Sequence, residues 1–424
     1  MTGTTSRTGH RGGPTSLRAE ETSPGAPLHQ RTCRAVFCLF AVYGALWGPY
    51  LALLPQLRRS TGIGEGHYSA ALFIGALAAL PAMYVTGRLV DRWGPRSVPA
   101  FVAVFALAAM VPPFVGSVPG LFVAVTLFSC GSGACNVAVV AMASATEAAS
   151  GQRIMNRAHA LFPVGLLSAS LLTGALRTAG LPAEVIVPLL DTAVITALLA
   201  RRGDLLALIP TRLVRPRRQR ISRHALDRTG LTLCVLAALA MVVESSVQHW
   251  SAVFLDESLH APIGLSTAAP GIFAGAMAFG RLGGHWLSGH VSDRSVLMAS
   301  GALAASGALL LSAADRPVSA LLATALVGAA VSVAPPTSYA IIGRRVAPHI
   351  RGAAVGSVTS LASIGLMLGP ALVGQVAGSL DLRTALAGLA VIALAVSVLA
   401  VTVPATPQTD EAHAPVDEAH AAHR

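Results

Sequence analysis

Long apolar stretches, each bounded by charged or turn-forming residues, dominate the chain from residue 35 onward. Each is close to the roughly 20 residues that a helix needs to cross a bilayer. The pattern therefore predicts an all-α polytopic membrane protein with twelve transmembrane helices. They are expected at about 35–57, 68–90, 97–115, 121–143, 158–176, 181–200, 231–254, 265–287, 296–314, 318–342, 353–380 and 384–403.

Three polar segments divide this pattern. Residues 1–34, rich in Ser, Thr, Gly and Pro, are expected to form a disordered tail, and residues 405–424 form a second polar tail. Residues 201–228 hold nine Arg and are the only long hydrophilic stretch inside the chain, so they predict a basic linker. The predicted domains are thus an N-terminal bundle at 35–200 and a C-terminal bundle at 229–404, each of six helices.

An internal repeat supports this division. The segment at 73–78 (FIGALA) recurs at 273–278 (FAGAMA), and the segment at 87–92 (GRLVDR) recurs at 289–294 (GHVSDR). Parallel repeats related by an axis along the membrane normal are one plan on which transporters are built. We therefore expect two pseudo-symmetric bundles.

Composition excludes several soluble classes. Only 12% of the residues are charged, against roughly 25% in an average soluble protein. All 30 basic residues are Arg, and without Lys the chain can hold neither a P-loop nor a Schiff-base site. The Arg residues separate apolar runs instead of alternating with aromatic residues, so the expected partner is the lipid bilayer and not a nucleic acid.

The Arg residues also predict the orientation. If the N-terminus is cytoplasmic, 24 Arg fall in cytoplasmic segments, five fall outside and one lies within a span. By the positive-inside rule, both termini of this multi-pass protein should be cytoplasmic, in the cell membrane.

The positions of the cysteines indicate a role in helix packing and not in disulfide bonds or metal binding. All five lie in or beside apolar runs, so we expect no disulfide framework. Cys130 and Cys135 have a spacing that a metal could use, but the Gly, Ser and Ala between them favour a helix contact. The tail histidines His413, His420 and His423 are interpreted as part of a solvated acidic tail. No metal and no other cofactor are expected.

One motif resembles a known family. Residues 87–96 (GRLVDRWGPR) resemble the loop 2–3 signature of the major facilitator superfamily, and a weaker copy spans Gly289, Asp293 and Arg294. The resemblance covers 35–404. It implies a monomeric transporter, not an enzyme, that carries a small-molecule substrate by alternating access between two six-helix bundles.

The motif also has a physical reading. Gly87 and Gly94 permit a tight turn, while Asp91, Arg92 and Arg96 place charges at the membrane interface. The resemblance implies that Asp91 faces the N-terminal end of the eleventh helix, near Gly352 and Ala353, and latches the cytoplasmic side in the outward-open state. The alternative is a plain positive-inside loop.

Within the superfamily, the chain is most similar to the sugar-permease-like branch related to fucose permease. The supporting residues are the stretch 147–155 followed by His159, Glu244 placed six residues before Trp250, and the stretch 368–374 (LGPALVG).

Three charged residues are expected within spans, where each costs about 2.5–3.5 kcal/mol at a helix centre. Glu244 and Asp191 are candidates for proton coupling; Glu244 could instead anchor hydrogen bonds, and Asp191 belongs to a helix expected at the periphery. Arg281 could pair with a buried carboxylate or bind an anion.

By the same resemblance, spans 1, 4, 7 and 10 line the central cavity. The candidate cavity residues, with Arg281, are Trp47, Tyr50, Asn136, Gln248, His249, Trp250, Ser338 and Tyr339. The aromatic residues could stack on a sugar or a flat apolar ligand, or simply anchor span ends at the membrane interface.

The expected function is secondary active transport of a small molecule, coupled to protons through Glu244. The alternative within the class is an exporter of a toxic or secondary metabolite. A non-transporting membrane sensor is the alternative from another class, although both tails are short for a signalling domain. A membrane-embedded enzyme is not expected.

Overall fold

A computed structural model describes residues 26–150, 154–200, 227–287, 290–346 and 351–405. The described part is helical and holds no strand. Eleven helical segments are long and apolar enough to cross a membrane, and a shorter apolar segment, Val98–Phe114, supplies the remaining predicted span. The predicted all-α, twelve-span fold is confirmed.

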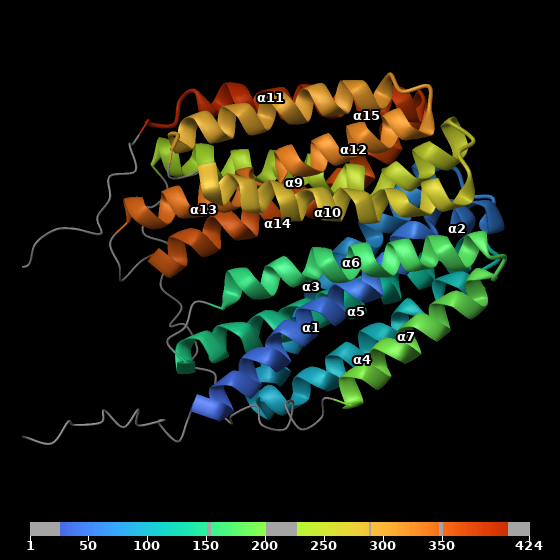
Figure 1. The fold of residues 1–424 in the computed structure, drawn as a ribbon, viewed down its shortest axis with the longest axis horizontal. Coiled ribbons are helices and arrows are strands. Elements are labelled where there is room, and N and C mark those ends of the chain that lie inside the picture. Colours follow the sequence, from blue (N-terminus) through green and yellow to red (C-terminus); the bar gives the residue numbers. More distant parts are fainter. Residues whose placement is uncertain (1–25, 151–153, 201–226, 288–289, 347–350, 406–424) are drawn as a thin grey trace, which may run out of the picture.

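Two bundles lie one above the other in Figure 1. The first comprises α1 (Ala26–Ala52), α2 (Leu54–Thr61), α3 (Glu65–Trp93), α4 (Val98–Ala109), α5 (Val118–Ser150), α6 (Met155–Thr178) and α7 (Ala183–Ala200). The second comprises α9 (Arg228–Val253), α10 (Ile263–Leu287), α11 (Asp293–Ser312), α12 (Pro317–Val331), α13 (Ala334–Arg345), α14 (Arg351–Ser379) and α15 (Leu382–Ala400).

Prolines explain where the helices depart from the expected spans. The third span ends as a regular helix at Ala109, before the Pro112–Phe114 turn, and the tenth is divided into α12 and α13 just before Pro335. A proline has no backbone N–H and its ring clashes with the preceding turn, so both breaks follow from local sequence. The first helix begins at Ala26, before the expected start, with Pro27 in its first turn, where proline is tolerated.

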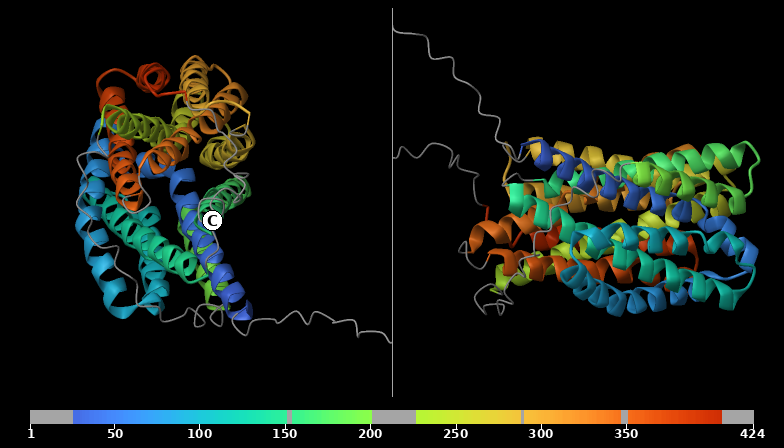
Figure 2. Two further views of the ribbon diagram at one scale, coloured as in Figure 1. Left: turned by 90° about the vertical axis from the view of Figure 1, so that its left-hand side faces the viewer. Right: turned by 90° about the horizontal axis from the view of Figure 1, so that it is seen from below.

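The molecule has two ends along the helix direction. The α2 end holds α2 and the π-turn η4 (Phe254–Ser258) that follows α9. The opposite end, here called the termini end, holds the start of α1 and the end of α15 (Figures 1 and 2). Residues 201–226 of the predicted linker, residues 1–25 and 406–424 of the predicted tails, and Gly289 lie outside the described residues.

The bundles meet through α3 with α14 and through α6 with α10. At the α2 end the α3 and α14 backbones approach closely, because a Cβ built on Gly378 would lie 2.8 Å from the Gly66 nitrogen. Between α6 and α10, the Ser170 hydroxyl donates to the Thr267 carbonyl at 2.8 Å. Small residues thus permit the tight contact between bundles.

Candidate functional site

An aromatic contact joins the two bundles, through residues in the last two turns of α1 and α9. Trp47 on α1 meets His249 on α9 edge to face, with ring centroids 5.9 Å apart. The Trp47 indole N–H donates to the Ser132 hydroxyl on α5 at 3.0 Å, and the Tyr43 hydroxyl lies 3.0 Å from the same oxygen. His249 is held by a 2.8 Å hydrogen bond between its Nδ1 and the Ser245 carbonyl. These bonds fix the orientation of two rings from different bundles.

A loose ion pair joins two helices of the C-terminal bundle. Glu244 on α9 and Arg281 on α10 approach to 3.8 Å, and their side chains are 9% and 33% exposed. A hydrogen bond between such charged groups is normally about 2.7–2.9 Å long. Within the described part of the chain, the Glu244 Oε2 and the Arg281 Nε are both buried without a hydrogen-bond partner. The pair therefore neutralises charge while leaving hydrogen-bonding capacity unused.

Two further titratable side chains interact with the charges of this pair. Tyr339 on α13 interacts with both Glu244 and Arg281. His159 on α6 interacts with Arg281 from the other bundle and packs against Phe40, with ring centroids 4.7 Å apart. The site is thus built from both bundles, and its charges come from α9 and α10.

Other sequence candidates have different surroundings. Trp250 is fully buried and donates to the Pro370 carbonyl at 2.9 Å. The buried Tyr50 hydroxyl lies 3.1 Å from that of Tyr68, and its ring stacks on Phe128. The Ser338 hydroxyl bonds to the Ala334 carbonyl of its own helix. Asn136 and Gln248 are half-buried on α5 and α9.

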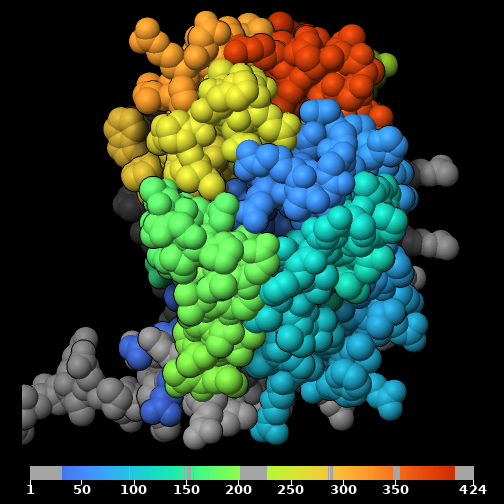
Figure 3. Space-filling model, turned by 90° about the vertical axis from the view of Figure 1, so that its right-hand side faces the viewer, coloured from blue at the N-terminus to red at the C-terminus, as the bar shows by residue number. Residues whose placement is uncertain are grey.

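A cluster of ions closes the α2 end. Arg58 on α2 is 5% exposed and meets Glu65 on α3 at 3.0 Å and Glu257 on η4 at 2.8 Å. Its guanidinium also lies 5.6 Å from the centroid of the Trp250 ring. Next to it, Arg59 pairs with Asp256. Figure 3 shows this face, where α2 (blue) packs against η4 and α10 (yellow) of the other bundle.

Sequence reasoning treated Arg58 and Arg59 only as loop charges and missed this cluster. A signal was available, because Glu65, Asp256 and Glu257 are among the acidic residues next to the spans that end on the same side. We call Arg58, Arg59, Glu65, Asp256 and Glu257 the α2-end cluster.

A model for the Major Facilitator Superfamily matches residues 35–315 and 284–423. The chain belongs to this superfamily. Members are transporters and not enzymes, so the chain is a multi-pass membrane transport protein.

Relatives and solved structures agree with this membership. An uncharacterized MFS-type transporter of Yersinia pestis is 26% identical over 396 residues, covering 90% of this chain and 97% of the relative. A bacterial homolog of the human lysosomal transporter Spinster has the same fold, with a TM-score of 0.70, 13% identity, and coverage of 88% and 96%. The E. coli fucose:proton symporter also shares it, with a TM-score of 0.59, 16% identity, and coverage of 88% and 98%.

The superfamily motif lies at the termini end. Asp91, Arg92 and Arg96 are exposed, and Gly94 has a φ of 74°, a left-handed conformation that favours glycine. The side chains of residues 351–353 lie outside the described residues, so the latch between Asp91 and the eleventh helix stays a prediction.

In the second copy of the superfamily motif, the buried Asp293 pairs with Arg344 at the end of α13. Arg294, the next residue, is half-buried. Both partners of this ion pair belong to the C-terminal bundle, so it fastens α11 to α13 and does not join the bundles.

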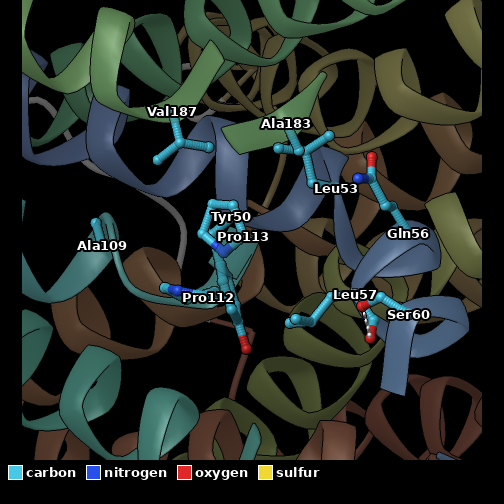
Figure 4. A pocket seen from close by; sticks show the side chains of 10 residues that line it. All are labelled: Tyr50, Leu53, Gln56, Leu57, Ser60, Ala109, Pro112, Pro113, Ala183 and Val187. Atoms are coloured by element: carbon cyan, nitrogen blue, oxygen red, sulfur yellow. Dashed lines mark hydrogen bonds between the residues drawn. The ribbon is translucent and has the colours of Figure 1, made fainter. Parts of the chain in front are cut away.

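Asp191, the second coupling candidate, lies away from the central site. It is 1% exposed on α7, and its Oδ2 has no hydrogen-bond partner among the residues that the structure describes. One and two turns earlier on the same helix face, Val187 and Ala183 line a small cavity with Tyr50 and Gln56 (Figure 4). Asp191 is thus placed inside the N-terminal bundle and not between the bundles.

Proposed function

We propose that this protein is a proton-coupled secondary transporter that works by alternating access, with both termini in the cytoplasm. The observation that carries the proposal is Glu244, a carboxylic acid buried in a membrane span and paired with Arg281, which in turn interacts with His159 of the other bundle. A carboxylate in such a place is costly unless it is paired or protonated. Among the described residues its ion pair is the loose one with Arg281, so a proton can replace that partner.

The distribution of contacts supports alternating access. At the α2 end, Arg58 and Arg59 join α2 to η4 across the bundles. At the termini end, the ion pairs of Arg344 with Asp293 and of Arg345 with Asp227 lie within the C-terminal bundle. This is the arrangement expected of a transporter closed at the α2 end.

The Arg distribution supports the orientation. The five Arg residues predicted to lie outside all belong to helix ends at the α2 end: Arg58, Arg59, Arg177, Arg316 and Arg383. The described residues Arg88, Arg92, Arg228, Arg344 and Arg345 belong to helix ends at the termini end, which the positive-inside rule assigns to the cytoplasm. With the α2 end on the outside, the conformation is then closed toward the outside.

Untargeted metabolomics tests the coupling for a substrate of any chemical class. Cells that express the wild type or Glu244→Gln are compared with and without a protonophore. We expect to find a metabolite whose cell-to-medium ratio changes when the wild type is expressed and returns to the control value when the protonophore is added. In cells that express Glu244→Gln, this ratio should not depend on the protonophore. Glu184→Gln, an exposed change on α7, is the matched control. Proton-driven gradients that survive Glu244→Gln unchanged would contradict the role of Glu244.

A further inference from the structure

We infer that the carried molecule is a small organic monoanion whose carboxylate binds Arg281. The inference rests on the proposed function and names its substrate class. Its starting point is the unused hydrogen-bonding capacity of the central ion pair. The 3.8 Å separation between the Arg281 Nη2 and the Glu244 Oε1 holds the charges near each other without a hydrogen bond.

Arg281 is equipped to bind an external carboxylate. Its side chain is one-third exposed, whereas that of Glu244 is almost fully buried, so an incoming molecule can reach the guanidinium more readily than the carboxyl. Its Nε has no hydrogen-bond partner in the described ranges. A guanidinium binds carboxylates through two parallel N–H donors, a geometry that the present pair does not provide.

The balance of charges around Glu244 and Arg281 determines which charge a bound substrate should carry. Among the described residues, Tyr339 on α13 interacts with both charges of the pair, and His159 on α6 interacts with Arg281. The spans of α12, α14 and α15 add no charged residue away from their ends. With Glu244 ionised, the pair is neutral. With Glu244 protonated, Arg281 leaves one positive charge, which attracts a monoanion and repels a cation.

The neighbouring side chains restrict the rest of the molecule. Gln248, Asn136 and Tyr339 are half-buried polar groups on helices of the two bundles, and Trp47 and His249 form an aromatic contact between the bundles. Hydroxyl groups or a ring on the substrate would match these side chains. A hydroxylated or aromatic monocarboxylate therefore fits better than a simple fatty acid.

This arrangement links the anion to the proton. Glu244 competes with the substrate carboxylate for Arg281, and protonation removes the competitor. Binding one proton with one anion strengthens anion binding by up to about tenfold for each unit by which the pH falls, over the range in which the carboxyl titrates. The two ligands also cancel in charge, so the loaded carrier is as neutral as the empty one.

Thermal-shift binding assays on the purified full-length protein test the inference. The probes are three carboxylates, each beside a matched alcohol: gluconate with sorbitol, mandelate with 1-phenyl-1,2-ethanediol, and lactate with 1,2-propanediol. We expect at least one carboxylate, and none of the alcohols, to stabilise the wild type, more strongly at pH 5.5 than at pH 8. Isothermal titration then measures the Kd of each stabilising probe.

Variants separate binding from folding. Arg281→Gln should weaken the binding by at least about thirtyfold, as expected for loss of a charge-assisted bidentate contact, and Arg281→Lys should recover part of it. Glu244→Gln should bind the anion without pH dependence. Arg316→Gln, an exposed change at the α2 end, is the control, and each variant's unliganded melting temperature and elution volume report its fold.

The outcomes also separate this inference from the proposed function. Stabilisation by alcohols alone, by no probe, or equally in a folded Arg281→Gln variant would overturn the anionic substrate. Carboxylate binding that requires Arg281 but shows no pH dependence would support the anionic substrate and contradict proton coupling through Glu244. Proton-coupled transport of a neutral metabolite would support proton coupling through Glu244 and contradict the anionic substrate.

Discussion

Two arginines face buried or half-buried carboxylates in this transporter, and the two regions differ in how completely those contacts are made. In the α2-end cluster, Arg58 reaches Glu65 and Glu257 within 3.0 Å and lies over the Trp250 ring. At the central site, Arg281 approaches Glu244 to 3.8 Å. The first arrangement joins the two bundles, whereas the second lies within one bundle.

Under the proposed function, the difference corresponds to that between a gate and a binding site. A contact between bundles can close one end of the molecule only if its charges are well satisfied, because burying an unpaired charge is costly. A site that must accept a ligand needs polar groups whose hydrogen bonds are still available. The loose pair in the centre and the tight cluster at the α2 end therefore suit different steps of one transport cycle.

The largest expected effect follows from removing Arg58, which should weaken the closure of the α2 end. Losing one partner of a buried pair costs about 3–5 kcal/mol, and the roughly 30% exposure of Glu65 and Glu257 reduces this to about 2–3 kcal/mol. Arg58→Gln should therefore shift the population toward the state open at the α2 end by about 30- to 150-fold. Spin labels at Glu184 and Val318, exposed positions in different bundles, would report the opening by double electron–electron resonance in a cysteine-free background.

The matched control for Arg58→Gln is Arg316→Gln at the same end, which should leave the distance distribution unchanged. If Arg58→Gln leaves that distribution unchanged as well, the α2-end cluster does not hold the gate closed.

Asp293 provides the opposite test, because its ion pair with Arg344 lies within one bundle. Arg344 is half-exposed, so Asp293→Asn should lower the free energy of unfolding by about 1–2 kcal/mol, as for a charged hydrogen bond. The bundle distance measured with the same spin labels should not move. Denaturation in SDS measures the stability, and a shifted distance would place Asp293 in the gate instead.

Hydrophobic periodicity was sufficient to predict the spans, because lipid requires each spanning segment to satisfy its own backbone. It also placed Glu244 and Arg281 inside spans, which made them candidates for function. What it could not predict is that the two side chains face each other from α9 and α10, since helix rotation depends on packing across the whole bundle.

The pairing of charged side chains across the bundles was not predicted from the sequence either. Arg58 and Glu257 are separated by 199 positions, and nothing local to either indicates its partner. The roles expected for Trp250 and Ser338 were inferred from the helices that carry them. In the structure, the Trp250 indole and the Ser338 hydroxyl donate hydrogen bonds to backbone carbonyls, a detail of rotation and depth that residue type does not reveal.

The pair of Arg59 with Asp256 allows a smaller test of the gate. Arg59 is about half-exposed, so its coupling to Asp256 should be about 0.5–1 kcal/mol. A double-mutant cycle with Arg59→Gln and Asp256→Asn, read from the same label distances, isolates that energy. The coupling should shrink at high salt, whereas a salt-independent or zero value would assign the closed end to packing alone.

Asp227 gives the smallest expected effect and concerns the termini end. Its carboxylate caps α9 by accepting the Gly230 backbone N–H at 2.7 Å and also accepts from Arg345 at 2.9 Å. The Gly230 hydrogen bond, followed by the Arg345 interactions, lowers the pKa of Asp227 below its ordinary value. Because the pKa is lower in the folded state than the ordinary value of about 3.9, this stabilisation is fully present above about pH 4 and is lost as the pH falls through the lowered pKa.

Asp227→Asn isolates the charge, because asparagine caps a helix about as well as aspartate. The variant should be less stable than the wild type by about 0.5 kcal/mol or less at pH 7, since the side chain is half-exposed and its pairing with Arg345 is screened. The stabilities of the wild type and the variant should become equal as the pH falls below about 4 and through the lowered pKa of Asp227. Melting curves in detergent between pH 7 and pH 3 measure this difference. A difference that persists at pH 3 would assign the effect to the shape of the cap and not to its charge. A bundle distance that changes with Asp227→Asn would show that an ion pair within one bundle also affects the gate.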